Sequence, residues 1–161
     1  MFPADLIRAA EVLSERLRSA GLVLATAESC TGGLIAGLLT ELPGSSDILD
    51  RGFVTYSNEA KHEMIGVPAD MIGQYGAVSR EIAEAMAHGA IAHSNGTVSV
   101  AVTGVAGPGG GTADKPVGLV HIAAVHGTVL KHRECRFGDT DRQKIRLDTI
   151  AVALELVEEV I

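Results

Sequence analysis

Apolar residues near the start of the chain recur every three to four positions, at Leu6, Ala10, Leu13 and Leu17. Charged residues occupy positions between them, so this spacing predicts an amphipathic helix that ends near Gly21. The next segment, residues 22–27, is apolar except for one threonine. Such a short apolar run is typical of a strand that is buried on both faces of a sheet.

The alternation of helical and extended patterns continues along the chain. It predicts helices over residues 31–42, 59–65, 68–75, 80–94 and 141–161, and strands over residues 52–56, 98–103, 117–125 and 129–137. Ser57-Asn58 and Ser79 stand where helix N-caps are expected, and the last two strands meet at Gly127-Thr128 as a hairpin. This order predicts an α/β fold: a three-layer α/β/α sandwich with a mostly parallel mixed sheet, as a single domain over residues 1–161.

Composition and charge narrow the class of function. The 161 residues carry a formal net charge of -7 and 3% aromatic residues, so we expect no nucleic-acid partner. No apolar stretch approaches the roughly 20 residues that span a bilayer, and no signal peptide is evident. We therefore expect no membrane association and a cytoplasmic location. The two cysteines and six histidines show no ligand spacing, which predicts no metal, and we expect no cofactor.

Polar residues follow three of the predicted strands, at Glu28-Ser29, Tyr56-Ser57 and Thr103-Gly104. In open α/β sheets the binding crevice lies at the carboxyl ends of the strands. These three segments are polar in a chain that is otherwise apolar there. We therefore expect them to converge on a functional site.

Ser29 is the candidate nucleophile of this site. It stands where a buried strand turns into a helix that opens with Thr31-Gly32-Gly33. Free N–H groups at such a turn can hold a developing oxyanion, and the glycines let a substrate approach the backbone. A competing interpretation is that Ser29 or Thr31 is only an N-cap. The segment also lacks the Gly-x-Ser-x-Gly pattern of a nucleophile elbow.

A serine nucleophile needs a base, and Lys61 is the candidate. It lies about one helical turn after Asn58, and burial or nearby positive charge can lower the pKa of a lysine far enough for base catalysis. The competing interpretation is an ordinary solvated lysine. His62 is the one histidine near a predicted strand end. Four residues separate Tyr56 from Lys61, whereas the Tyr-x-x-x-Lys pattern of dehydrogenases has three, which weakens that alternative.

Two further features are candidates for substrate binding. The Gly-rich loop over residues 104–114 follows a strand, as a phosphate-binding loop does, but it matches neither the Gly-x-x-x-x-Gly-Lys-[Ser/Thr] nor the Gly-x-Gly-x-x-Gly pattern. Arg142 and Arg146 stand in the first turns of the last helix, where they can clamp a phosphate or a carboxylate. Ordinary surface arginines are an equally good interpretation.

Taken together, these segments resemble the C-terminal domain family of the competence/damage-inducible protein CinA. The resemblance runs in family order across nearly the whole chain, through the segments Ala27-Glu28-Ser29-Cys30-Thr31-Gly32-Gly33, Gly52-Phe53-Val54-Thr55-Tyr56-Ser57-Asn58 with Lys61, Gly76-Ala77-Val78-Ser79, Thr103-Gly104-Val105-Ala106-Gly107-Pro108, Gly110-Gly111 and Lys115-Pro116-Val117-Gly118. Stand-alone members of the family are nicotinamide-nucleotide amidases. The resemblance therefore implies hydrolysis of the carboxamide of nicotinamide mononucleotide to nicotinic acid mononucleotide and ammonia.

The resemblance also implies roles for residues. Ser29 attacks the amide carbon, Lys61 takes its proton and passes it to ammonia, and Tyr56 helps to position the pair. The remaining family positions bind substrate, with the N–H groups after Ser29 holding the oxyanion: Cys30, Thr31, Gly32, Gly33, Thr103, Gly104 and Arg142.

The spacing before the arginine departs from the family pattern. The family usually has Gly-Asp-Arg after the last strand, whereas this chain has two extra residues before Arg142. Arg146 is therefore the alternative.

The implied partner is a small-molecule substrate. The sequence does not settle the oligomeric state, for which a homodimer is the expected form. Two other functions stay open: a nucleotide- or partner-binding module without catalysis, and an amidase for another small carboxamide.

Overall fold

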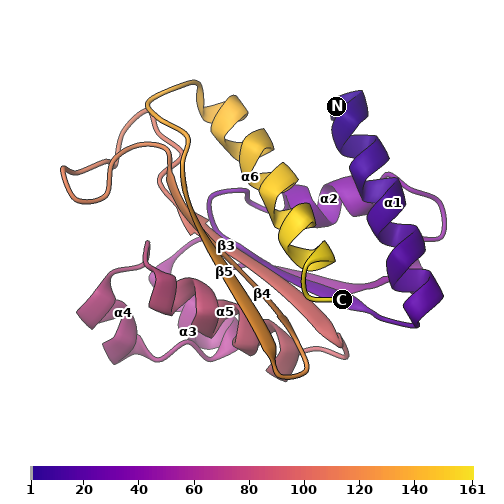
Figure 1. The fold of residues 1–161 in the computed structure, drawn as a ribbon. Helices are drawn as coiled ribbons and strands as arrows, with labels where there is room; N and C mark the ends of the chain where they lie inside the picture. The colour runs from indigo at the N-terminus through magenta and orange to yellow at the C-terminus, as the bar shows by residue number, and fades with distance from the viewer. Residues whose placement is uncertain (1) are drawn as a thin grey trace.

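A five-stranded mixed sheet forms the middle layer of the molecule. The computed structural model describes residues 2–161, and its sheet has the order β2-β1-β3-β4-β5 (Figure 1). β1 pairs in parallel with both β2 and β3, whereas β4 pairs antiparallel with β3, and β5 pairs antiparallel with β4. The strands are β1 (Leu24–Glu28), β2 (Leu49–Val54), β3 (Val98–Gly104), β4 (Leu119–His126) and β5 (Val129–Arg136).

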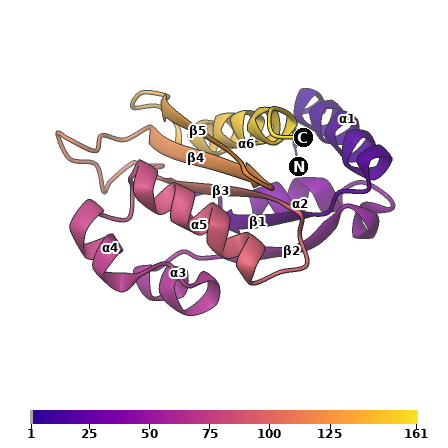
Figure 2. The ribbon, with the colours of Figure 1, turned by 60° about the horizontal axis from the view of Figure 1, so that its bottom comes forward.

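Helices cover both faces of this sheet, and the three-layer α/β/α prediction is confirmed. Figures 1 and 2 show α1 (Ala4–Ala20), α2 (Leu34–Thr40) and α6 (Arg142–Glu158) on one face. The other face carries α3 (Asn58–Ile65), α4 (Ala69–Tyr75) and α5 (Arg80–Ala92). Within residues 2–161, no helix combines the length and the apolar content that crossing a membrane requires.

Side chains that alternate along the central strands feed two separate hydrophobic cores. On β1, Leu24 packs into the core under α1, α2 and α6, whereas Ala25 and Ala27 pack into the core under α3, α4 and α5. All five residues of β1 are buried. This explains the continuous apolar run in the sequence, because a strand in the middle of a three-layer sandwich has no solvent face.

Local capping set most of the boundaries that the sequence predicts. Gly21 ends α1 with φ +64°, a left-handed conformation that glycine adopts without strain. Ser57 Oγ accepts a hydrogen bond from the N–H of Ala60 at 3.0 Å, and Ser79 Oγ accepts one from Ile82 at 3.3 Å. Both predicted N-caps are confirmed.

Among the boundaries that differ from the prediction, two lie beside Ser29 and Lys61. The helix expected from Thr31 begins at Leu34, because Gly32 and Gly33 have φ values of +60° and +96°, which an α-helix does not allow. The strand expected over residues 52–56 spans 49–54 instead. After the N–H of Thr55 donates to the carbonyl of Glu28, the chain leaves the sheet toward α3.

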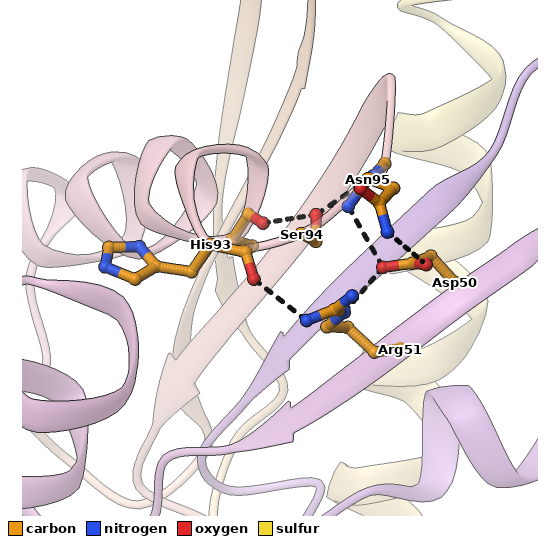
Figure 3. A network of polar contacts seen from close by, with 7 residues as sticks. Asp50, Arg51, His93, Ser94 and Asn95 are labelled. Atoms are coloured by element: carbon orange, nitrogen blue, oxygen red, sulfur yellow. Dashed lines mark hydrogen bonds and ion pairs between the residues drawn. The ribbon is translucent and has the colours of Figure 1, made fainter.

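A polar network joins β2 to the loop after α5 at the amino ends of the parallel strands (Figure 3). The carboxylate of Asp50 pairs with Arg51 and accepts hydrogen bonds from the backbone and side-chain nitrogens of Asn95 at 3.1 and 3.3 Å. Arg51 also donates to the carbonyl of His93. The network fastens the edge strand at the end of the sheet opposite to Ser29.

Candidate active site

Ser29 lies directly after β1, at the carboxyl end of the sheet. Its N–H donates to the carbonyl of Val102 on β3 at 3.0 Å, and its own carbonyl accepts from Gly32 at 3.0 Å. The side chain is only partly buried. These two bonds extend the β1–β3 ladder by one residue and then turn the chain sharply, so the hydroxyl stands at the edge of the sheet.

Lys61 brings its amine to this hydroxyl from α3. The Nζ atom lies 3.2 Å from Ser29 Oγ, 2.9 Å from the carbonyl oxygen of Thr55 and 3.5 Å from that of Ser57. The side chain is 1% exposed. Within residues 2–161 no carboxylate forms an ion pair with it. The predicted pair of Ser29 and Lys61 is therefore brought into contact.

Burial lowers the pKa of Lys61 below its ordinary value, because water no longer solvates the ammonium form. In the neutral form, the amine can donate its two N–H groups to the carbonyls of Thr55 and Ser57. Its lone pair then remains for the hydroxyl proton of Ser29. This is the arrangement that a general base needs.

Two N–H groups beside Ser29 have no partner within the described residues, those of Cys30 and Thr31. The N–H groups of Gly32 and Gly33 bond instead to the carbonyl of Ser29 and the carboxylate of Glu28. Of the four residues expected to bind substrate here, only Cys30 and Thr31 offer a free backbone donor. Their position suits an oxyanion that forms on a carbonyl oxygen when Ser29 attacks the carbon bonded to it.

The side chains of Cys30 and Thr31 do not extend this role. Burial raises the pKa of Cys30 to about 12, so its thiol is neutral and is no rival nucleophile to Ser29. The hydroxyl of Thr31 is fully buried and donates to Glu28 at 2.7 Å. Of these two residues, only the backbone N–H groups are therefore available to a ligand.

Thr103 and Gly104 end β3 beside Ser29. The hydroxyl of Thr103 donates to the carbonyl of Ala77 at 2.7 Å and keeps lone pairs that can accept from a substrate. Gly104 lies so close to β4 that a Cβ atom would come within 2.6 Å of Val120. A larger residue would push the two strands apart at the site.

Tyr56 and Arg142 contact each other at the mouth of the site. The guanidinium of Arg142 donates to the Tyr56 hydroxyl at 3.0 Å and to the carbonyl of Gly107 at 2.7 Å. Tyr56 is 60% exposed and forms no hydrogen bond with Ser29 or Lys61 within the described residues. In this structure Tyr56 thus lies beside the expected substrate arginine rather than beside the pair.

Arg146 and His62, the alternatives considered from the sequence, have other contacts. Arg146 donates to the carbonyl of Thr31 at 2.9 Å, which places it against the turn that follows Ser29. The ring of His62 bonds to the carbonyl of Val67. Arg142 therefore reaches the mouth of the site and the Gly-rich loop, whereas Arg146 supports the turn.

One residue of the site was given no role from the sequence. Glu28 ends β1 with a carboxylate that is fully buried and that accepts hydrogen bonds from the turn after Ser29. The available signal was a single acidic residue at the end of an apolar strand. A buried carboxylate needs several donors, and the next residues supply them.

Similarity to known proteins shows the family of the chain. A family model described as the CinA C-terminal domain matches residues 7–161. The chain belongs to the CinA C-terminal domain family. It is 42% identical to the nicotinamide-nucleotide amidohydrolase PncC of Escherichia coli K12, over 96% of this chain and 94% of that protein. Among solved structures, the competence/damage inducible protein CihA from Agrobacterium tumefaciens has a TM-score of 0.97 and 51% identity, over 99% of this chain and 97% of that one.

Other CinA relatives are longer than this chain. A CinA-like protein from Syntrophobacter fumaroxidans is 46% identical over 94% of this chain, which covers 35% of that relative. A competence-damage inducible relative from Caldicellulosiruptor bescii is covered over 36% of its length. The chain thus spans little more than a third of these curated relatives, and nearly the whole of PncC.

Proposed function

We propose that this chain hydrolyses the carboxamide of nicotinamide mononucleotide to nicotinic acid mononucleotide and ammonia. The observation that carries the proposal is the buried amine of Lys61 at 3.2 Å from Ser29 Oγ. The near full-length similarity to a nicotinamide-nucleotide amidohydrolase supports this choice of substrate. A small-molecule substrate, a cytoplasmic location and a homodimer belong to the same proposal.

The first half of the reaction releases ammonia. Ser29 Oγ attacks the carboxamide carbon while Lys61 Nζ takes the hydroxyl proton. The negative charge on the former carbonyl oxygen is held by the N–H groups of Cys30 and Thr31. Lys61 then gives its proton to the amide nitrogen, the C–N bond breaks, and ammonia leaves an acyl ester on Ser29.

The second half regenerates the enzyme. Lys61, neutral again, takes a proton from a water molecule, whose oxygen attacks the ester carbon. The ester bond to Ser29 breaks, Oγ recovers a proton from Lys61, and the product leaves as a carboxylate after its carboxylic acid gives a proton to solvent. Each proton that Lys61 accepts is passed on within the same half-reaction, so one amine serves both halves.

The remaining site residues would hold the nucleotide. Arg142 would bind the phosphate, because it is a cation that lies against Gly107 of the Gly-rich loop and against Tyr56. Tyr56 would position that arginine. Thr103 and Gly104 would contact the substrate, as the family resemblance implies.

The direct test is release of ammonia and nicotinic acid mononucleotide from nicotinamide mononucleotide by the purified protein. We expect Ser29→Ala to lower turnover by roughly a thousandfold or more, because the acyl intermediate cannot form. His62→Ala is the control and should keep full turnover. His62 is the neighbour of Lys61 on α3, but its ring bonds to the carbonyl of Val67. Undiminished turnover by Ser29→Ala would contradict the mechanism.

The same assay separates the two other candidate functions. Turnover of a different small carboxamide, with none of the mononucleotide, would keep the mechanism and change the substrate. Binding of the mononucleotide in a calorimeter without any turnover would favour a binding module.

A further inference from the structure

Glu28 has the most complete set of hydrogen bonds of the side chains around the site. Its Oε1 atom accepts from the Thr26 hydroxyl at 3.1 Å and from the N–H of Ala36 at 2.9 Å. Its Oε2 atom accepts from the Thr31 hydroxyl at 2.7 Å, and from the N–H groups of Gly33 and Ile35 at 3.0 Å each. The carboxylate is fully buried, and no cation pairs with it within residues 2–161.

These bonds decide which backbone donors of the turn stay free. Between residues 30 and 36, the carboxylate of Glu28 takes the N–H groups of Gly33, Ile35 and Ala36. The carbonyls of Ser29 and Thr31 take two more, from residues 32 and 34. Only the N–H groups of residues 30 and 31 remain, and both lie beside the nucleophile. A buried backbone N–H group needs a hydrogen-bond partner, so the donors that Glu28 and the two carbonyls bind are no longer available to a ligand.

We propose that Glu28 is a positioning residue for the oxyanion pocket, and that it acts on the turn through Thr31, Gly33 and the start of α2. Glu28 precedes Ser29 directly and binds the turn that follows it, so one side chain fixes both the nucleophile and the free donors. The inference rests on the proposed hydrolysis. It goes further in naming a residue that touches neither substrate nor Ser29 Oγ yet sets the rate of the chemical step.

This role predicts a specific kinetic signature. The oxyanion exists in the transition state and not in the bound substrate, so a displaced donor lowers kcat and leaves KM nearly unchanged. A merely structural anchor would lower the melting temperature or the folded fraction without lowering kcat per folded molecule. Measuring kcat per folded molecule, KM and the melting temperature together therefore separates a positioning role from a purely stabilising one.

Two threonines offer a matched test, because each donates one hydroxyl to Glu28 from a buried position. Thr31→Val removes the donor in the turn, and Thr26→Val removes the donor on the strand. We expect Thr31→Val to lower kcat on nicotinamide mononucleotide by about tenfold with KM within about twofold. Thr26→Val should keep kcat while losing a similar amount of thermal stability. Equal kcat for the two variants would overturn the proposal.

A third variant and a second readout complete the design. Glu28→Gln places an amide nitrogen against backbone donors, so we expect a larger fall in kcat than in Thr31→Val. Normal kcat in that variant would also overturn the proposal, and the threonine pair decides the matter if the variant does not fold.

The rate at which a fluorophosphonate labels Ser29, followed by intact mass, reports the same pocket without the nucleotide. If the wild type is labelled but does not hydrolyse the mononucleotide, the proposed substrate is wrong, and the threonine pair is compared by labelling rate instead. If the pair labels and turns over alike, the amidase stands and the positioning role of Glu28 is wrong.

Discussion

Glu28 and Lys61 are both buried, ionisable and adjacent to Ser29, but they lie in different layers and are partnered differently. Glu28 faces α2 and accepts five hydrogen bonds, whereas Lys61 reaches in from α3 and contacts three oxygens, none of them a carboxylate. The five donors offset the cost of burying the Glu28 carboxylate. A buried ammonium without a counter-charge has no such compensation, and burial lowers the pKa of Lys61.

The difference assigns the two residues to different tasks. Groups whose burial is compensated by many bonds rigidify their surroundings, and Glu28 does this for the turn. Burial that is poorly compensated shifts a pKa, and the downward shift at Lys61 is in the direction that base catalysis requires. Glu28 at the end of β1 and Lys61 on α3 therefore approach Ser29 from two layers, one suited to hold the turn and the other to act as a base.

The variant Lys61→Met is the strongest test of the difference between Glu28 and Lys61, because it keeps the apolar stem of the side chain and removes the amine. We expect turnover to fall by roughly a thousandfold or more, because Lys61 is the one base that contacts Ser29 within residues 2–161. The melting temperature should be no lower than that of the wild type. The carbonyl of Thr55 loses one hydrogen bond, which costs about 1 kcal/mol, but the variant no longer buries an amine that lacks a counter-charge.

Turnover and thermal unfolding of the same preparation measure both effects. Lys61→Arg serves as the control that keeps a cation and cannot act as a base. It should be as inactive as Lys61→Met and clearly less stable. A strongly destabilised Lys61→Met variant would show that the amine is a structural anchor like Glu28.

The pH dependence of the rate sharpens the comparison further. Because burial lowers the pKa of Lys61, the log of kcat/KM should rise with pH and level off below the ordinary lysine value of about 10.4. The stability follows the same group. Between its folded and unfolded pKa values the unfolded chain binds more protons, so stability rises with pH across that window.

Lys61→Met provides the control for this profile. The variant should lack the rise in stability over the same pH window, which urea unfolding at several pH values would show. A rate profile that is flat from neutral to mildly alkaline pH would argue that the base is another group.

Part of the site around Ser29 could be predicted from the sequence, and part of it could not. Lys61 could be predicted as a candidate base, because Ser57 caps α3 and Lys61 lies about one turn into that helix, whereas its pairing with Ser29 was implied by the family resemblance. The role of Glu28 did not, because it requires the helix to begin at Leu34 rather than Thr31. That shift depends on the φ values of two glycines, which a hydrophobic pattern does not reveal.

The contact between Tyr56 and Arg142 also lay beyond sequence reasoning. It joins residues 86 positions apart in the chain and depends on the path of the connection between β5 and α6. The spacing after Gly138 left Arg142 and Arg146 as alternatives. Only the packed structure shows that Arg142 reaches the mouth of the site, while Arg146 bonds to the turn that follows Ser29.

The smallest expected effect is on stability and concerns Asp50. Its carboxylate belongs to the polar network at the opposite end of the sheet from Glu28. The guanidinium of Arg51, followed by the N–H of Asn95, lowers the pKa of Asp50 below its ordinary value. The charged carboxylate thus stabilises the fold above its unfolded pKa of about 3.9, and this contribution is lost as the pH falls through the lower, folded value. Asp50→Asn should lower the melting temperature at pH 7 by roughly 1–3 °C.

The difference between Asp50→Asn and the wild type should shrink toward pH 3, and high salt should reduce it as well, because exposed ion pairs are screened. Turnover should be unchanged, since Asp50 stands at the amino end of β2 and Ser29 at the carboxyl end of β1. A loss of turnover at unchanged stability would mean that the edge strand transmits its anchoring to Thr55 and so to Lys61. The conclusion that Glu28 positions the site, whereas Asp50 only stabilises the fold, would then be wrong.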